Sequence, residues 1–348
     1  MKYRKLGRTD LDVSLICLGT MNMGEQNSEA EGHAQMDYAL AQGINFFDTA
    51  EMYAIPPKRE TYGRTEEIIG TWLQARQSRN TVILATKVVG RSDNDWLREG
   101  GGRARPVKTQ IVTALENSLR RLKTDHVDLY QLHWPDRLIT WGGNPTVYQH
   151  QEPDDEIAID ETLRALDELV RSGKVRHIGL SNESAWGTMT FLKHSELQGL
   201  ARVQSVQNAY SLINRTAETA LAEIFMREQV GLLAFSPLAQ GFLTGKYLDG
   251  ALPAGARKTL FNRQQRYEKP GSETAIKAYV DLAREFGLDP AQMALSFVNS
   301  RVFLGSNIIG ATTMAQLKSN IASIDMAMTP ELESRINAIH QVHMNPTP

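Results

Sequence analysis

Short apolar runs alternate with longer amphipathic stretches along most of the chain. A short apolar run bounded by turn residues predicts a buried strand, and apolar residues three and four positions apart predict a helix. The predicted strands are 16–20, 44–50, 81–87, 126–134, 175–182, 202–208, 231–237 and 306–312. The predicted helices are 28–43, 64–76, 108–122, 160–173, 185–197, 217–229, 273–286 and 291–298. Strand and helix therefore alternate about eight times.

This alternation is typical of an α/β fold in which parallel strands close into a (β/α)8 TIM barrel. The segment 3–14 predicts a β-hairpin, turned at Gly7–Asp10, that closes the barrel floor. An open doubly wound sheet is the main alternative, but Gly19 and Gly24 have the wrong spacing for a dinucleotide-binding turn. No Pro/Ser-rich linker interrupts the chain, so we expect a single barrel domain over 1–348.

Polar side chains with complementary chemistry follow the predicted strands. Asp48, Lys87 and His133 lie at the carboxyl-terminal tips of the second, third and fourth strands, and Tyr53 lies just beyond Asp48. Active sites of parallel barrels lie at the carboxyl ends of the strands, so these side chains are expected on one rim. Taken singly, Asp48 could cap the next helix and Tyr53 could be a half-buried aromatic. Lys87 could likewise be a surface lysine, and His133 a satisfied core histidine.

Together, these side chains suit the reduction of a carbonyl group. Hydride addition to a carbonyl carbon builds negative charge on the oxygen, which must then be protonated. Tyrosine is a weak acid, but the Lys87 ammonium would stabilise its phenolate and make Tyr53 a better proton donor. Asp48 can keep Lys87 charged and in place, and His133 can polarise the carbonyl through a hydrogen bond.

Composition excludes several other classes of function. The 348 residues carry a formal net charge of −2, and their scattered basic residues form no footprint for nucleic acid. No apolar stretch approaches the length of a membrane span, and we expect a cytoplasmic protein. The only cysteine, Cys17, lies in an apolar run and cannot form an intrachain disulfide. His340 and His343 have no carboxylate or cysteine partner nearby, so no metal site is expected.

Three segments together resemble the signature sequences of the aldo-keto reductases. They read "GINFFDTAEMY", "ATKV" and "VDLYQLHWPD", and the resemblance extends essentially from end to end. It implies a (β/α)8 barrel that uses NADPH/NADP+ to reduce aldehyde or ketone carbonyls to alcohols. The catalytic tetrad of the family falls here on Asp48, Tyr53, Lys87 and His133, with Tyr53 as the general acid.

The resemblance also assigns residues that bind the cofactor. Those expected at the nicotinamide are Ser181, Asn182, Gln207 and Tyr210, the last stacking on the ring. Those expected on the pyrophosphate side are Ser236, Leu238, Gly241 and Lys246. Those expected at the adenosine phosphate are Gly310, Thr312, Gln316 and Asn320.

Physical chemistry supports the last group in part. A threonine, an amide and a helix beginning at 314–316 suit a 2′-phosphate. Arg257 is the guanidinium that we expect at the adenine or its phosphate. The family often has an acidic residue where Ser319 stands, which leaves the adenine contacts open at this point.

Two other functions are alternatives to carbonyl reduction. Aldo-keto reductase folds also serve as cofactor-sensing regulatory subunits of ion channels with slow turnover, and an intact tetrad favours an enzyme without excluding that role. A metal-dependent hydrolase would need more ligands on the rim than the chain offers.

Loops 91–106 and 134–156 carry aromatic residues that could line a substrate pocket or simply pack: Trp96, Trp134, Trp141 and Tyr148. We expect a small-molecule carbonyl substrate, no nucleic acid or membrane partner, and a monomer or weak homo-oligomer.

Overall fold

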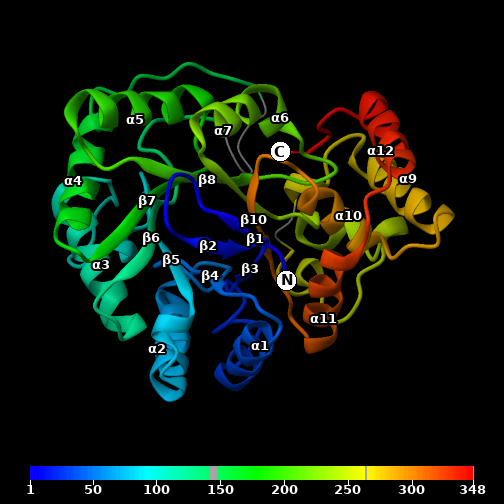
Figure 1. The fold of residues 1–348 in the computed structure, drawn as a ribbon, viewed down its shortest axis with the longest axis horizontal. Coiled ribbons are helices and arrows are strands. Elements are labelled where there is room, and N and C mark those ends of the chain that lie inside the picture. The colour runs from blue at the N-terminus through cyan, green and yellow to red at the C-terminus, as the bar shows by residue number, and fades with distance from the viewer. Residues whose placement is uncertain (141–146, 263–264, 348) are drawn as a thin grey trace.

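Eight parallel strands form a closed barrel at the centre of the molecule (Figure 1). The computed structural model describes residues 1–140, 147–262 and 265–347. In barrel order the strands are β10 (Leu304–Ile309), β3 (Ile16–Gly19), β4 (Phe46–Asp48), β5 (Ile83–Val88), β6 (Val127–Leu132), β7 (Val175–Ser181), β8 (Val203–Ala209) and β9 (Gly231–Phe235). The predicted (β/α)8 barrel is confirmed.

An antiparallel hairpin closes the floor of the barrel, as predicted. It is formed by β1 (Tyr3–Lys5) and β2 (Asp12–Ser14), and it crosses in front of the barrel strands in Figure 1. Leu6, Leu11 and Val13 of this hairpin are buried against side chains inside the barrel, among them Phe46 and Leu233. The hairpin therefore seals the end of the barrel opposite the carboxyl ends of the strands.

The helices form a ring around the barrel (Figure 1). They are α1 (Glu29–Ala41), α2 (Arg64–Arg76), α3 (Lys108–Leu122), α4 (Ile159–Arg171), α5 (Ala185–Gln198), α6 (Thr216–Ala220), α7 (Ala222–Glu228), α8 (Arg257–Phe261), α9 (Ser272–Glu285), α10 (Pro290–Asn299), α11 (Met314–Ala322) and α12 (Pro330–Val342). The predicted helix over 217–229 is divided at Leu221 into α6 and α7. Across the described part of the chain, no helix is long and apolar enough to cross a membrane.

Local sequence signals explain where these helices begin and which face they bury. Ser28 caps α1 in a capping box, because its hydroxyl accepts from the Glu31 N–H while its own N–H donates to the Glu31 carboxylate. On α4, Leu163, Leu166 and Leu169 recur at helical intervals and are all buried. Such apolar faces pack the helices against the outside of the barrel.

Strand register brings the polar rim residues to the inside of the barrel. Asp48 on β4 lies opposite Ala85 on β5, and Lys87 lies opposite Gln131 on β6. Lys87 is two residues beyond Ala85, so it points to the same face of the sheet as Ala85 and Asp48. The period of two along each strand therefore places an acid and a base side by side within the rim.

The floor hairpin gives a first test of the fold. Leu6→Ala should lower the free energy of unfolding by about 2–5 kcal/mol, because Leu6 is fully buried in the floor cluster. Leu197→Ala, at an exposed position on α5, is the matched control and should change it by no more than about 0.5 kcal/mol. Urea denaturation measures both. Equal effects of the two substitutions would show that the hairpin does not contribute to the core.

Candidate functional site

A buried ammonium group lies at the centre of the rim. Lys87 is 0% exposed, and its Nζ donates to Asp48 Oδ1 at 2.6 Å, to the Thr49 carbonyl oxygen at 2.7 Å and to the Tyr53 hydroxyl at 3.3 Å. A lysine ammonium has three protons, so these three acceptors satisfy it. The surface interpretation of Lys87 is therefore wrong.

The second oxygen of Asp48 is occupied as well. Asp48 Oδ2 accepts from Gln207 Nε2 at 2.8 Å and from Gln131 Nε2 at 3.1 Å. Gln207 Nε2 also lies 3.2 Å from Gln131 Oε1. Asp48 thus bonds to Lys87 and two buried amides, whereas α2 begins at the N-cap Gly63. The Asp48 side chain therefore positions Lys87 and does not cap a helix.

Tyr53 and His133 complete the cluster that the sequence predicts. Tyr53 is 8% exposed, and its ring meets the His133 ring edge-on, with centroids 5.8 Å apart and planes at 79°. The Lys87 Nζ lies 4.8 Å from the centroid of the Tyr53 ring. Among the described residues, the buried His133 Nδ1 has no hydrogen-bond partner. The structure therefore brings all four predicted rim residues together.

The environment determines the protonation of each group. Burial disfavours the Lys87 ammonium, but Asp48 and Tyr53 outweigh this, so the pKa of Lys87 lies above its ordinary value. Burial raises the pKa of Tyr53, although the Lys87 charge acts in the opposite direction. Burial, assisted by the charge of Lys87, holds the pKa of His133 well below its ordinary value. At neutral pH the cluster therefore contains an ammonium, a phenol and a neutral imidazole.

Two opposing effects determine the pKa of Tyr53. The Lys87 charge lowers it, in the direction that the sequence predicts, but burial has the larger effect and raises it. The consequence is a phenol that keeps its proton at neutral pH. Lys87 still favours the phenolate relative to a site without the cation.

The residues predicted at the nicotinamide divide into two sets. Asn182 Nδ2 donates to the His133 carbonyl oxygen at 2.9 Å, and the Ser181 hydroxyl donates to the Gln207 carbonyl oxygen at 2.9 Å. Asn182 has a left-handed backbone with φ of 51°, a conformation that asparagine tolerates better than most residues. Asn182 and Gln207 therefore bond directly to tetrad residues, and Ser181 bonds to both of them.

Tyr210 is not brought to the cleft. Its ring is 0% exposed, and its hydroxyl donates to Glu218. The ring stacks on Phe297 with centroids 6.0 Å apart and meets Phe303 edge-on. Tyr210 lies beyond the last residue of β8, where its side chain packs among the helices outside the barrel. The expected stacking on a nicotinamide does not fit this enclosed position.

Phe235 is the aromatic residue that the sequence reasoning missed. It is the last residue of β9, it is only half-buried, and it directly precedes Ser236. The sequence "AFSP" at the end of a predicted strand was the available signal, because the last residue of a barrel strand reaches the rim. Phe235 is therefore better placed than Tyr210 to present a ring to the cleft.

The loop after β9, where the sequence predicts the pyrophosphate contacts, contains residues with left-handed backbone. Ser236 and Gly241 have left-handed backbones with φ of 54° and 100°. The φ of 100° favours glycine at position 241, and a Cβ there would lie 2.8 Å from Lys246 Cε, so that lysine would have to move. The Leu238 carbonyl oxygen accepts from the Gly241 N–H at 2.8 Å, which closes the turn. Burial, with the nearby Arg257, lowers the pKa of Lys246.

The start of α11 carries the residues predicted at the adenosine phosphate. The Thr312 N–H and hydroxyl donate to Gln316 Oε1 at 2.9 and 3.0 Å. Thr313 caps α11, since its hydroxyl accepts from the Gln316 N–H at 3.2 Å. Asn320 Nδ2 donates to the Gly310 carbonyl oxygen at 3.1 Å. These bonds hold the predicted helix N-terminus in one arrangement.

Arg257, the first residue of α8, bonds to the loop that follows β3. Its guanidinium donates to Asn22 Oδ1, and its Nε lies 3.3 Å from Gln26 Oε1. In the same loop, Asn27 Nδ2 donates to the Thr312 carbonyl oxygen at 2.8 Å. Arg257 and the Thr312 carbonyl therefore bond to different residues of one segment. The Arg257 charge also acts to lower the pKa of Tyr53, so the guanidinium lies near the tetrad.

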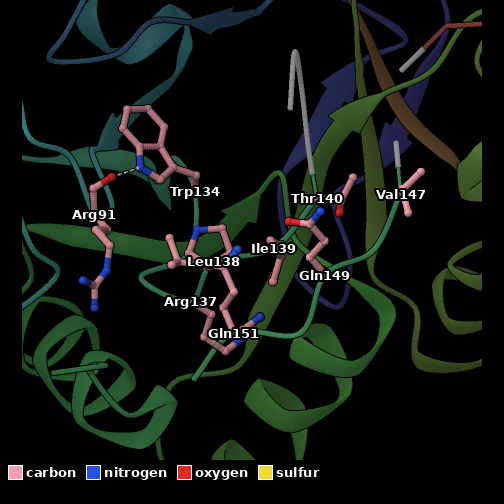
Figure 2. A pocket seen from close by; sticks show the side chains of 10 residues that line it. Arg91, Trp134, Arg137, Leu138, Ile139, Thr140, Val147, Gln149 and Gln151 are labelled. Atoms are coloured by element: carbon pink, nitrogen blue, oxygen red, sulfur yellow. Dashed lines mark hydrogen bonds between the residues drawn. The ribbon is translucent and has the colours of Figure 1, made fainter. Parts of the chain in front are cut away.

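A cavity of about 340 Å³ lies beside Trp134 (Figure 2). Its lining includes Arg91, Arg137, Leu138 and Gln151. The Trp134 indole N–H donates to the Arg91 carbonyl oxygen at 2.8 Å, and its ring lies 4.8 Å from the His133 ring. Trp134 is thus the aromatic residue that joins this cavity to the tetrad.

The other loop aromatics have different surroundings. Trp96 packs edge-on against Tyr62 with centroids 5.8 Å apart, and the side chain of Tyr148 is exposed. Trp141 lies outside the described residues. Within residues 1–140, 147–262 and 265–347, no group of three or more His, Cys, Asp and Glu side chains is arranged to hold a metal ion.

Comparison with known proteins identifies the family. A sequence model of the Aldo/keto reductase family matches residues 15–341. The chain belongs to the aldo/keto reductase family. It is 48% identical over 348 residues to Protein tas of Escherichia coli K12, covering all of both chains.

Of two more distant relatives, one is named as an oxidoreductase and the other as a probable channel subunit. The chain is 36% identical over 342 residues to "Uncharacterized oxidoreductase YrpG" of Bacillus subtilis, covering 97% of this chain and 96% of that one. It is 30% identical over 361 residues to "Probable voltage-gated potassium channel subunit beta" of Oryza sativa subsp. japonica, covering 98% and 97%. Family and relatives together make this chain an oxidoreductase.

The neutral His133 predicts a pH dependence of stability. In the unfolded chain a histidine has a pKa near 6.5, whereas the pKa of folded His133 is well below that. As pH falls below about 6.5, the unfolded state binds a proton that the folded state does not. His133 should therefore reduce the free energy of unfolding by up to about 1.4 kcal/mol per pH unit in that range.

Substitution isolates this contribution. Urea denaturation of the native protein and of His133→Gln at pH 7.5, 6.5 and 5.5 measures it. The variant should lose stability less steeply below pH 6.5. An unchanged slope would assign the pH dependence to other groups.

Proposed function

We propose that this aldo/keto reductase reduces aldehyde or ketone carbonyls with NADPH, and that Tyr53 is the general acid. The observation that carries the proposal is the contact between a buried, charged Lys87 and the hydroxyl of a protonated Tyr53 beside a neutral His133. This arrangement provides a proton donor whose conjugate base is stabilised where it forms.

In the proposed reaction, Tyr53, Lys87 and His133 control the transfer of the proton to the carbonyl oxygen. Bound NADPH supplies the hydride that adds to the carbonyl carbon. As the carbonyl π electrons move to oxygen, that oxygen takes the proton of the Tyr53 hydroxyl and the alcohol is formed. The Lys87 ammonium stabilises the tyrosinate left behind, and solvent returns the proton. The neutral His133 donates a hydrogen bond from its one N–H and orients the carbonyl.

The donor set around the cleft supports NADPH as the cofactor. The capped start of α11 presents the N-terminus of a helix, which favours a phosphate, and the loop after β9 carries Lys246. Lys246 and Arg257 bring positive charge to the same cleft. Ser181, Asn182 and Gln207 supply polar groups beside the tetrad for the nicotinamide amide.

A cofactor-sensing regulatory subunit is the second candidate, because one relative is named as a probable channel subunit beta. The complete, buried tetrad favours turnover. Oxidation of NADPH should be measured against a panel of aldehydes, ketones and quinones, together with the dissociation constant for NADPH. Tight binding of NADPH with no turnover on any member of the panel would favour the sensor.

For the enzyme we further propose a small-molecule substrate, a cytoplasmic location and a monomeric or weakly oligomeric state. Light scattering tests the oligomeric state.

Tyr53→Phe tests the proton donor directly. It removes the hydroxyl and keeps the ring, so turnover should fall by roughly 10²–10⁴-fold while the dissociation constant for NADPH hardly changes. Tyr279→Phe is the matched control, because Tyr279 is equally buried but lies on α9. Steady-state kinetics and fluorescence titration measure the two quantities. Turnover within a few-fold of the native rate would make Tyr53 an ordinary aromatic.

Arg257→Ala tests the preference for NADPH over NADH. If the guanidinium binds the 2′-phosphate, the variant should raise the dissociation constant for NADPH by roughly tenfold or more and leave that for NADH nearly unchanged. Arg227→Ala, at an exposed helix position on α7, is the control. Fluorescence titration gives the four dissociation constants. Equal weakening of both cofactors would place the Arg257 contact elsewhere.

A further inference from the structure

A second buried carboxylate lies in the turn between Asp48 and Tyr53. Glu51 is 0% exposed, and its two oxygens accept four hydrogen bonds. The Val89 N–H donates to Oε1 at 2.8 Å, and the Tyr62 hydroxyl donates to Oε2 at 2.8 Å. The Arg98 guanidinium is bidentate, with Nη1 3.0 Å from Oε2 and Nη2 3.1 Å from Oε1. The proposed reaction gives Glu51 no role.

The donors to Glu51 come from three separate segments. Val89 follows β5 and is two residues beyond Lys87, Tyr62 precedes α2, and Arg98 belongs to loop 91–106. The Glu51 N–H also donates to the Lys87 carbonyl oxygen at 3.2 Å. Glu51 therefore binds the turn that carries Tyr53 to the strand end that carries Lys87. A bidentate guanidinium fixes direction as well as distance.

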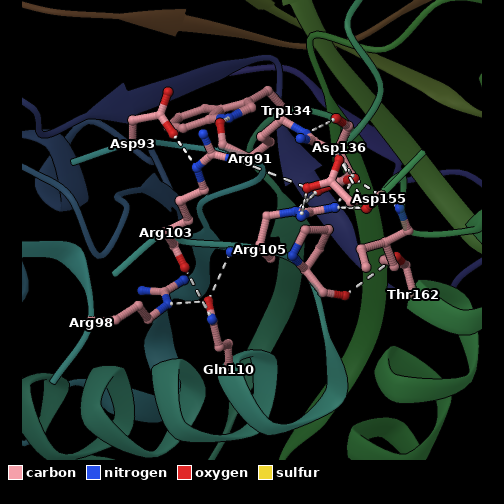
Figure 3. Close-up of polar contacts among 12 residues, drawn as sticks. Arg91, Asp93, Arg98, Arg103, Arg105, Gln110, Trp134, Asp136, Asp155 and Thr162 are labelled. Carbon is pink, nitrogen blue, oxygen red and sulfur yellow. Dashed lines mark hydrogen bonds and ion pairs between the residues drawn. The ribbon is translucent and has the colours of Figure 1, made fainter. Parts of the chain in front are cut away.

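Further polar contacts lead from Arg98 through Gln110 and Arg105 to Asp136 (Figure 3). Arg98 Nε donates to Gln110 Oε1 at 3.0 Å, and the Arg105 N–H donates to that oxygen at 2.8 Å. Arg105 Nε in turn donates to Asp136 Oδ1 at 2.6 Å. Asp136 lies three residues beyond His133. A continuous polar chain thus joins the Tyr53 turn to the segment that follows the imidazole.

We propose that Glu51 is a positioning residue for Tyr53, acting through Val89 and Arg98. This inference rests on the proposed role of Tyr53 as the proton donor. The Tyr53 hydroxyl is 3.3 Å from Lys87 Nζ, near the outer limit of a hydrogen bond, so a small shift of the turn breaks the contact. Misplacement of a reacting group by about 1 Å costs on the order of 10²-fold in rate.

Glu51→Gln tests the role by removing the charge at nearly constant volume. We expect kcat to fall by roughly 10–100-fold, with the dissociation constant for NADPH within about threefold of native. Asp128→Asn is the matched control. Asp128 is buried on β6 and accepts from Arg79, Arg176 and the Leu84 N–H, which is a similar set of partners away from Tyr53. It should lower stability without lowering kcat.

A double-mutant cycle separates positioning from a general loss of structure. If Glu51 acts through Tyr53, Glu51→Gln should lower kcat by less than about threefold when Tyr53→Phe is already present. An equal loss in both backgrounds would overturn the proposal. Should Glu51→Gln fail to fold, Tyr62→Phe removes one of the four hydrogen bonds and keeps the ring. It should give a smaller fall in kcat that also disappears beside Tyr53→Phe.

Hydrogen–deuterium exchange supplies a readout that does not depend on turnover. In Glu51→Gln, amides in 49–62 and 91–105 should exchange faster together, while those of 330–342 keep the native rates. Faster exchange in a protein that reduces no carbonyl would reject the proposed function and retain the link between the two segments. Unchanged exchange in both segments would overturn the positioning role whatever the activity.

Discussion

Removing an ammonium group from water costs several kilocalories per mole unless its hydrogen bonds are replaced inside the protein. Lys87 meets this demand with the Asp48 carboxylate, the Thr49 carbonyl and the Tyr53 hydroxyl. Asp48 in turn requires the amides of Gln131 and Gln207, which come from β6 and β8. One buried cation therefore accounts for the polar side chains that surround it at this rim, and burial together with its charge lowers the pKa of the neighbouring imidazole.

The two ends of the barrel bury different kinds of side chain. At the floor, the hairpin packs Leu6, Leu11 and Val13 against apolar side chains inside the barrel. At the rim, polar side chains are buried, and nearly every one is paired with a specific partner. A buried polar network of this kind tolerates little displacement, because each lost bond leaves an unsatisfied group. The apolar floor supplies stability, and the rim holds its groups in a single arrangement.

Much of this arrangement could be predicted from the sequence, and the failures have physical causes. Strands and helices follow from periodicity, and Asp48, Lys87 and His133 follow from their places at strand ends. Tyr210 also lies near a strand end, but sequence does not reveal that its ring packs against Phe297 outside the barrel. The three residues that donate to Glu51 belong to separate segments of the chain, so no local pattern indicates them. The net direction of the Tyr53 pKa depends on burial, which only the folded structure supplies.

The two loops over the cleft are linked in a way that matters for protein engineering. Arg91 and Arg105 both bind Asp136 and Asp155, so loops 91–106 and 134–156 share their anchoring ion pairs. A loop transplanted alone from a relative would leave Asp136, which is almost fully buried, without its cations or bring new cations without their acid. Changing the shape of the cleft by loop exchange therefore requires that both loops be moved as one module.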